Sequence, residues 1–213
     1  MELLERLLHI DQELTLRINS CHSGISDNIM MMLSDHKVWI PLYAGVVAYL
    51  VYRLGWRRAF IVIVATALSF LFCDQLSNLS KSIFGRLRPC YSSYMLDNGL
   101  HMLEGRGGLY GFFSSHAANT IAYATCTSMG FRIDKSRKYH LYTSLIFIWA
   151  FAVGISRIFA GKHYLGDVLV GMIVGLVVGY LLSLFARWLC KKIEWRSSTK
   201  KASIHSSAIG ECS

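Results

Sequence analysis

Long apolar stretches separated by short polar ones dominate the chain after residue 37. An α-helix needs roughly 20 residues to cross the ~30 Å hydrocarbon core of a bilayer. Five stretches approach this length, and the first of them is the shortest: Val38–Leu54, Ala59–Leu79, Ser114–Ile133, Leu141–Ile158 and Val168–Cys190. The pattern predicts an all-α fold, a polytopic membrane helix bundle with about five transmembrane helices.

The first 36 residues follow a different pattern. Leucine and isoleucine recur every three or four positions between Leu3 and Ile18, with acidic residues between them. This period predicts an amphipathic helix that lies in the membrane interface and does not cross it. The next stretch, Asn19–Asp35, combines turn formers with a short apolar run, and we expect a surface hairpin or a re-entrant piece there. Residues 1–36 thus form a predicted interfacial N-terminal segment.

The composition fits a bilayer protein, with 54% hydrophobic and 16% charged residues and a mean hydropathy of +0.40. We interpret residues 1–190 as a single membrane-embedded domain. Residues 191–213 are rich in lysine and serine and have no apolar period. We expect this basic tail to be disordered.

The formal net charge of +9 comes largely from alternate loops. Lysine and arginine concentrate after the first, third and fifth apolar stretches. The positive-inside rule then places those loops and the C-terminus in the cytoplasm, and the N-terminus outside. Topology accounts for the basic excess, so we expect no nucleic-acid partner. The predicted location is the cytoplasmic (inner) membrane.

The six cysteines show no CxxC pair and no other spacing typical of metal ligands. The sequence therefore indicates no zinc site and no disulfide framework. Cys21 and Cys90 could pair if both face an oxidising compartment, and the sequence leaves this open.

Three clusters of polar residues fall at the ends of apolar stretches on the predicted outer side. The first contains Lys81 and Arg88, seven residues apart, so that they share one helix face before Pro89 ends the helix. Their side chains could converge on one anion. A basic helix end that reaches lipid head groups is the alternative.

The second cluster, Ser114, Ser115 and His116, opens the third stretch. A serine N-cap leaves the first backbone N–H groups free to face an anion, with the helix dipole behind them. His116 would then lie in the first turn, where it could give a proton to a leaving oxygen. An ordinary capped helix start explains the same residues.

The third cluster, Arg157, His163 and Asp167, joins the last two stretches. Ionisable groups this close to a membrane core usually mark a site. A carboxylate four residues after a histidine can fix its tautomer and leave the other ring nitrogen free to attack or to take a proton. Arg157 offers a donor fork suited to phosphate. A local hydrogen bond between His163 and Asp167 is the alternative reading.

In this order, the clusters resemble the motifs of the type 2 phosphatidic acid phosphatase superfamily, which membrane lipid phosphate phosphatases share with bacterial acid phosphatases and vanadium haloperoxidases. The motifs are Lys-x6-Arg-Pro, Pro-Ser-Gly-His and Ser-Arg-x5-His-x3-Asp. The first and third match in full, whereas Phe113 and Ser115 replace the proline and glycine of the second. The resemblance spans residues 74–171.

This resemblance implies that His163 attacks phosphorus and forms a phosphohistidine, with Asp167 orienting the imidazole. His116 would protonate the leaving oxygen and later activate water. The groups implied to hold the phosphoryl oxygens are Lys81, Arg88, Ser114, Ser115 and Arg157. The resemblance implies no cofactor and no metal ion. The glycine-rich loop Cys90–Phe112 is expected to cover the substrate.

The predicted function is an integral membrane phosphatase that removes a terminal phosphate from a lipid, which with other membrane lipids would be its partner. Undecaprenyl diphosphate or a lipid A phosphate is favoured, and phosphatidylglycerol phosphate and phosphatidate are alternatives. Two other classes stay open: a hydrolase with a metal ion bound by His116, His163 and Asp167, and a non-catalytic protein that binds or transports anionic lipid. The sequence does not indicate an oligomeric state.

Overall fold

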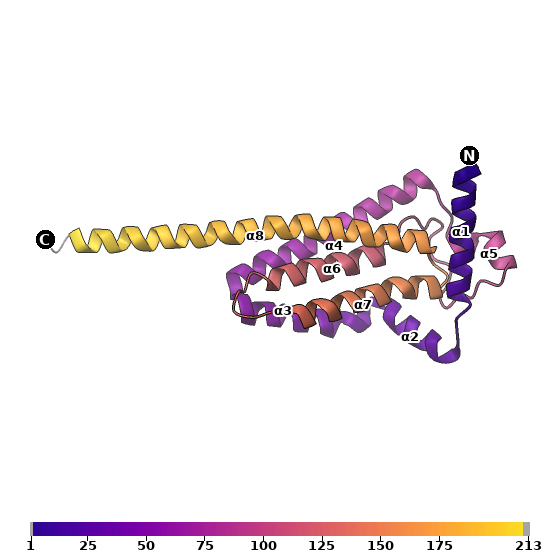
Figure 1. The fold of residues 1–213 in the computed structure, drawn as a ribbon, viewed down its shortest axis with the longest axis horizontal. Coiled ribbons are helices and arrows are strands. Elements are labelled where there is room, and N and C mark those ends of the chain that lie inside the picture. Colours follow the sequence, from indigo (N-terminus) through magenta and orange to yellow (C-terminus); the bar gives the residue numbers. More distant parts are fainter. Residues whose placement is uncertain (1, 211–213) are drawn as a thin grey trace.

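The computed structural model describes residues 2–210 of the chain, and side chains are described for residues 2–194. Its bundle helices run side by side in an elongated arrangement, and a further helix near the N-terminus lies across one end (Figure 1). The bundle helices are α3 (Ile40–Leu54), α4 (Trp56–Phe84), α6 (Ser115–Phe131), α7 (His140–Phe159) and α8 (Leu165–Gly210). The predicted all-α membrane bundle is confirmed.

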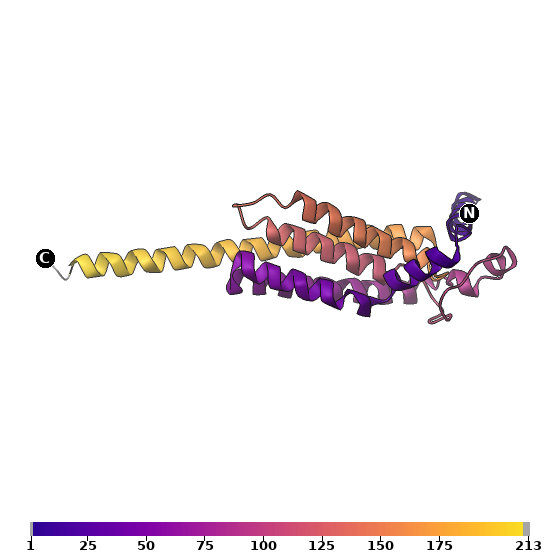
Figure 2. The ribbon, with the colours of Figure 1, turned by 90° about the horizontal axis from the view of Figure 1, so that it is seen from below.

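Helix α6 forms the core of the bundle and contacts α3, α4, α7 and α8 (Figures 1 and 2). Nearly every side chain from Ala117 to Phe131 is buried, and most of them are alanine, threonine, serine or cysteine. Small side chains let neighbouring helix backbones approach closely. This helix therefore packs against protein on most sides.

The closest approach is between α6 and α8, at a row of glycines one helical turn apart. A Cβ atom at Gly175 would lie 2.2 Å from the carbonyl oxygen of Ala118, and one at Gly171 would lie 2.5 Å from that of Ser114. The backbone N–H of Ser114 donates to the carbonyl oxygen of Asp167 at 3.0 Å. The glycine row thus brings the N-terminal ends of the two helices together.

Three of the five predicted spans are long and apolar enough to cross a membrane: Trp56–Phe84, His140–Phe159 and Leu165–Glu194. The other two correspond to α3, with 15 residues, and α6, with 17, which are shorter than a typical span. Burial of α6 inside the bundle explains why it carries so few large apolar side chains. The number of crossings therefore stays a prediction.

The N-terminal segment contains two helices, α1 (Glu2–Asn19) and α2 (Gly24–Ser34). Helix α1 agrees with the predicted amphipathic helix and lies across the end of the bundle (Figure 1). Of the two alternatives expected after it, the hairpin is wrong, because a capping box between Ser23 and Ser26 starts α2 there, and the re-entrant piece stays a prediction.

The basic tail also differs from expectation. Helix α8 continues to Gly210, where the sequence predicted disorder over residues 191–213, of which 211–213 lie outside the described residues. Residues 191–209 contain neither glycine nor proline, so nothing in the backbone chemistry of this segment ends the helix. The helix propensity of this segment indicated a helix, although the segment has no apolar period.

The connection from α4 to α6 folds over the end of the bundle beside α1 (Figures 1 and 2). It contains a 3-10 turn, Pro89–Tyr91, and the short helix α5 (Ser93–Asp97). An isolated antiparallel bridge joins Leu87 to Tyr110 and brings the two ends of the connection together.

Candidate active site

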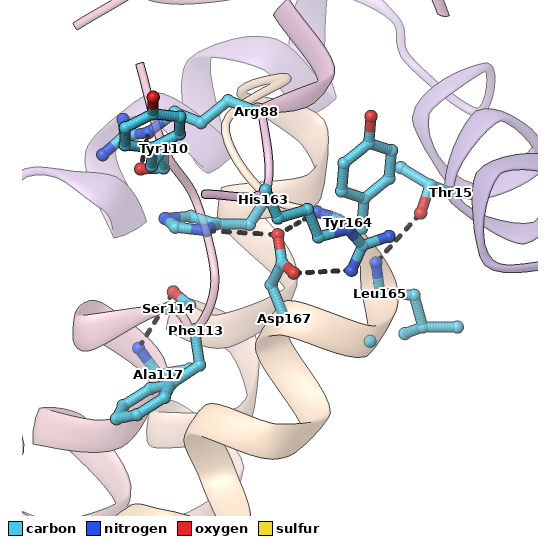
Figure 3. Close-up of polar contacts among 12 residues, drawn as sticks. Thr15, Arg88, Tyr110, Phe113, Ser114, Ala117, His163, Tyr164, Leu165 and Asp167 are labelled. Carbon is cyan, nitrogen blue, oxygen red and sulfur yellow. Dashed lines mark hydrogen bonds and ion pairs between the residues drawn. The ribbon is translucent and has the colours of Figure 1, made fainter. Parts of the chain in front are cut away.

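His163 and Asp167 lie at the turn from α7 into α8, as their spacing predicted. Gly161, with φ of +68°, reverses the chain after α7, and Asp167 falls in the first turn of α8. The His163 Nδ1 atom is 3.7 Å from Asp167 Oδ2, within ion-pair range but longer than a hydrogen bond (Figure 3). Asp167 Oδ2 also accepts from the backbone N–H of Tyr164 at 3.1 Å. Catalytic hydrogen bonds often tighten only when substrate is bound.

The His163 imidazole is buried, with 2% of the residue exposed. Burial lowers the pKa of His163 to about 4, and Arg157 and Arg88 act in the same direction, while Asp167 opposes them. The ring is therefore neutral at pH 7. Since Nδ1 faces Asp167, Nε2 is the nitrogen that remains for chemistry.

The second motif opens α6 as expected. Ser114 is the N-cap, and its Oγ accepts from the backbone N–H of Ala117 at 3.5 Å (Figure 3). Ser115 and His116 follow in the first turn and line a cavity of about 350 Å³. His116 lies near His163, and it is close enough to Arg157 and Lys81 for their charges to act on its ring.

The predicted phosphate-binding cations gather around the histidines. Arg88 Nε donates to the carbonyl oxygen of Tyr110 at 3.1 Å (Figure 3), and its charge acts on both His163 and Lys81. Arg157 is buried at the end of α7, and its Nη1 lies 3.2 Å from Glu104 Oε1. The structure thus collects at one end of the bundle all the residues that the sequence singled out: Lys81, Arg88, Ser114, Ser115, His116, Arg157, His163 and Asp167.

The connection between α4 and α6 covers these cations, and its contacts were not foreseen. Arg157 donates to Ser34 Oγ of α2 as well as to Glu104, and Ser34 Oγ lies 2.5 Å from Glu104. Buried Lys162 donates to the carbonyl oxygen of Gly105. Burial lowers the pKa of Lys162, and the Glu104 carboxylate opposes this shift. Glu104 could have been noted as an acid within the predicted cover loop.

A second unforeseen group links α1 to the site. Arg86 Nη1 is 2.7 Å from Asp167 Oδ1, and Arg86 Nη2 is 2.6 Å from Asp11 Oδ2. The guanidinium also lies 4.0 Å from the centroid of the Tyr164 ring. The sequence signal was present, because polar Asp11, Thr15 and Asn19 recur every fourth residue in α1 and so share one face.

Among the residues described, one group of histidine and acidic side chains is close enough to hold a metal ion: His22, Asp27 and His101. The two imidazoles are stacked, with centroids 3.8 Å apart and planes 11° from parallel. Parallel rings cannot both direct an in-plane lone pair at one ion. Within the described residues, the side chains of His116, His163 and Asp167 do not form such a group. Cys21 and Cys90 are both free.

Comparison with known proteins adds to this geometry. The family model of the PAP2 superfamily matches residues 58–191. A lipid A 4'-phosphatase of Bacteroides thetaiotaomicron is 34% identical over 194 residues, which cover 90% of this chain and 84% of that protein. A lipid A 4'-phosphatase of Porphyromonas gingivalis is 32% identical, with 87% of this chain and 79% of that protein covered.

The fold has a solved counterpart. The crystal structure of a transmembrane PAP2 type phosphatidylglycerolphosphate phosphatase from Bacillus subtilis superposes with a TM-score of 0.65. The match covers 84% of this chain and 86% of the other, at 18% sequence identity. At that identity the likeness concerns the fold.

Proposed function

The chain belongs to the PAP2 superfamily and is a membrane lipid phosphatase, and from this premise we propose that it hydrolyses the 4'-phosphate of a lipid A molecule through a phosphohistidine. One observation carries the reaction: a buried, neutral His163 backed by Asp167 and surrounded by cations. The substrate follows from the lipid A 4'-phosphatases that resemble the chain over most of its length.

In the first step, His163 Nε2 attacks phosphorus, an N–P bond forms and the bond from phosphorus to the sugar oxygen breaks. His116 gives its proton to that oxygen as it leaves. In the second step, His116 takes a proton from water, whose oxygen attacks phosphorus as the N–P bond breaks. The products are the dephosphorylated lipid and inorganic phosphate.

Asp167 holds the His163 ring through Nδ1 and stabilises the positive charge that the ring gains on attack. Lys81, Arg88 and Arg157 stabilise the charge on the equatorial oxygens of the transferred group. The first backbone N–H groups of α6, at Ser115 and His116, would donate to the same oxygens from the helix N-terminus. Ser114 contributes mainly as the cap that fixes this helix start, because its hydroxyl accepts from Ala117.

The cover loop has to move for substrate to enter. In this structure Glu104 forms an ion pair with Arg157. The carbonyl oxygens of Gly105 and Tyr110 accept hydrogen bonds from Lys162 and Arg88, respectively. A phosphoryl group carries the same kind of acceptor oxygens and would replace them on these donors. Loop opening therefore accompanies each turnover.

The cavity beside His116 suits the apolar part of the substrate. Its lining includes the aromatic side chains of Trp39, Tyr43 and Phe70 together with Asp74 and Asn119. The leaving oxygen would depart on this side, where His116 protonates it. The site would face the periplasm from the cytoplasmic (inner) membrane, since the opposite end of the bundle carries Arg53, Arg132 and Arg187.

A phosphate-release assay on the purified protein in detergent tests the proposal. It compares lipid A bearing only a 4'-phosphate, lipid A bearing only a 1-phosphate, undecaprenyl diphosphate, phosphatidylglycerol phosphate and phosphatidate. We expect fastest release from the 4'-phosphate, with a product lighter by one phosphate in mass spectrometry. Faster release from another lipid would overturn the substrate. Lipid binding without phosphate release, unchanged in His163→Ala, would favour the non-catalytic alternative.

A further inference from the structure

The interfacial helix α1 reaches the catalytic carboxylate through one arginine. The Arg86 guanidinium lies between two carboxylates, 2.6 Å from Asp11 of α1 and 2.7 Å from Asp167 of α8. All three side chains are largely buried, with 20% of the Arg86 side chain, 16% of Asp11 and none of Asp167 exposed. Asp167 uses its other oxygen toward His163. The arginine that contacts its outer oxygen is therefore held in turn by Asp11 of α1.

Helix α1 also supplies the cap that α8 lacks. Asp11 Oδ1 accepts from the backbone N–H of Gly166 at 2.7 Å, and Thr15 Oγ1 accepts from that of Leu165 at 2.9 Å (Figure 3). These are N–H groups of the first turn of α8, which have no partner within their own helix. A Cβ atom at Gly166 would lie 2.8 Å from Asp11 Oδ2, so a larger residue there would displace the carboxylate.

The rest of the polar face of α1 fixes the end of α7. Asn19 Nδ2 donates to the carbonyl oxygens of Ile158 and Phe159 at 3.0 and 3.2 Å. His163 lies in the short turn between the two helix ends that α1 holds. On its other face, α1 exposes Leu3, Leu4 and Leu7, as an interfacial helix does.

We propose that Asp11 is a positioning residue for phosphate hydrolysis, which acts through Arg86 to hold Asp167 toward His163. The inference rests on the proposed function and adds to it a residue outside the family match, which begins at residue 58. Without the Asp11 charge, Arg86 has only Asp167 as a charged partner, so its guanidinium is no longer held on both sides and can rotate. The contact between Arg86 and the outer oxygen of Asp167 then loses its fixed geometry.

Burial alone would lower the pKa of Arg86, but Asp167 and Asp11 more than offset burial, so the pKa is raised and the guanidinium stays charged. A charged guanidinium between two carboxylates has a fixed orientation. Displacing a catalytic group by about 1 Å can reduce the rate about 100-fold. The effect should therefore appear in kcat.

The test measures kcat and KM for Asp11→Asn on whichever lipid of the panel the parent hydrolyses fastest. We expect kcat to fall about 10- to 100-fold with KM nearly unchanged, and Asp11→Glu to recover part of the loss. Glu5→Gln, a charge removed from an exposed position of the same helix, is the matched control and should behave like the parent. A parent-like kcat in Asp11→Asn would overturn the proposal.

A double-mutant comparison of Asp11 with Asp167 distinguishes a positioning role of Asp11 from a merely structural one. If Asp11 acts through Asp167, then Asp11→Asn should cost nothing further in an Asp167→Asn background, whereas a structural contact would cost the same factor in both backgrounds. Orthovanadate binding, which needs no lipid, provides a second readout and should weaken in Asp11→Asn. A parent that neither releases phosphate nor binds orthovanadate would overturn the proposed function itself, a result distinct from an active parent with a parent-like Asp11→Asn.

Discussion

The two ends of the bundle both collect arginines, but they use them differently. At the end opposite the site, Arg53 Nη2 lies 2.5 Å from Asp134 and its Nε lies 2.9 Å from the Tyr139 hydroxyl. Arg58 pairs with Glu194 at 2.9 Å. At the site end, neither Lys81 nor Arg88 forms an ion pair with a carboxylate among the described residues.

The difference lies in which element supplies the counter-charge. Asp134 follows closely after α6 and holds Arg53 with short, fixed contacts, and hydrogen bonds from Tyr139, Ser136 and Arg53 lower its pKa. Arg157 is paired with Glu104 on a loop that covers the site. Arg53 and Arg58 tie segments together at one end, as Arg86 does at the other, whereas Arg88, Arg157 and Lys162 at the site end can exchange their loop partners for an anion.

Replacing His163 by alanine should give the largest loss of activity and so the sharpest difference between the two ends of the bundle. The variant removes the proposed nucleophile from the site end and leaves the arginine pairs at the opposite end intact. We expect kcat to fall at least about 10⁴-fold, as for other nucleophile deletions. Phosphate release measures the loss, and melting temperature checks the fold. An alanine variant with substantial activity would remove His163 from the nucleophilic role.

Gly175→Leu should disturb both ends together, because the contact between α6 and α8 is common to them. A Cβ atom at this position lies 2.2 Å from the Ala118 carbonyl oxygen, so the helices must separate. We expect a destabilised protein with little activity, measured by size-exclusion profile and phosphate release. Gly45→Ala on α3, where a Cβ meets nothing within 4 Å, is the control and should be neutral or slightly stabilising. Parent-like behaviour of Gly175→Leu would refute the close packing.

The pH dependence of phosphohistidine formation tests whether the His163 ring, at the site end of the bundle, is buried. A pKa lowered to about 4 means that His163 stays neutral as the pH falls from 7 to 5, and gains a proton only as the pH falls through about 4. We expect the single-turnover rate of phosphoenzyme formation to fall as His163 is protonated near pH 4, well below the ordinary histidine pKa of about 6.5. A loss centred at 6.5 that His163 itself causes would contradict the buried, desolvated ring.

Asp134→Asn should give the smallest effect on activity and a clear effect on stability. The variant keeps the shape of the side chain but removes the charge that holds Arg53. We expect a lower melting temperature with kcat and KM unchanged, because the site lies at the other end. A drop in kcat comparable to that of the site variants would show that the ends are coupled.

Motif spacing predicted which residues meet at the site. His163 and Asp167, four residues apart, are adjacent because a helix begins between them, and the start of α6 at Ser115 follows from its serine cap. Local chemistry of this kind depends on a few neighbouring residues. Of the hairpin and the re-entrant piece expected after Asn19, the hairpin was wrong because the sequence reading overlooked the capping box at Ser23, although that box is also local.

The contacts of Asp11 and Glu104 could not be derived from spacing. Asp11 lies 75 residues from Arg86 along the chain, and Glu104 lies 53 residues from Arg157. Such pairs form because the chain folds back across the end of the bundle, and many partners would satisfy the same charges. The polar stripe of α1 indicated a buried face, but not what that face would bind.

The sequence by itself determined the helical membrane architecture and the order and spacing of the three polar motifs, because apolar length and local spacing act within single helices. Only the tertiary structure decided that α1 turns its polar face to the site, since this depends on how distant segments pack. It also decided that the loop between α4 and α6 supplies carbonyl and carboxylate oxygens to Arg88, Arg157 and Lys162. Buried cations require partners, and the folded chain determines which groups are near enough to provide them.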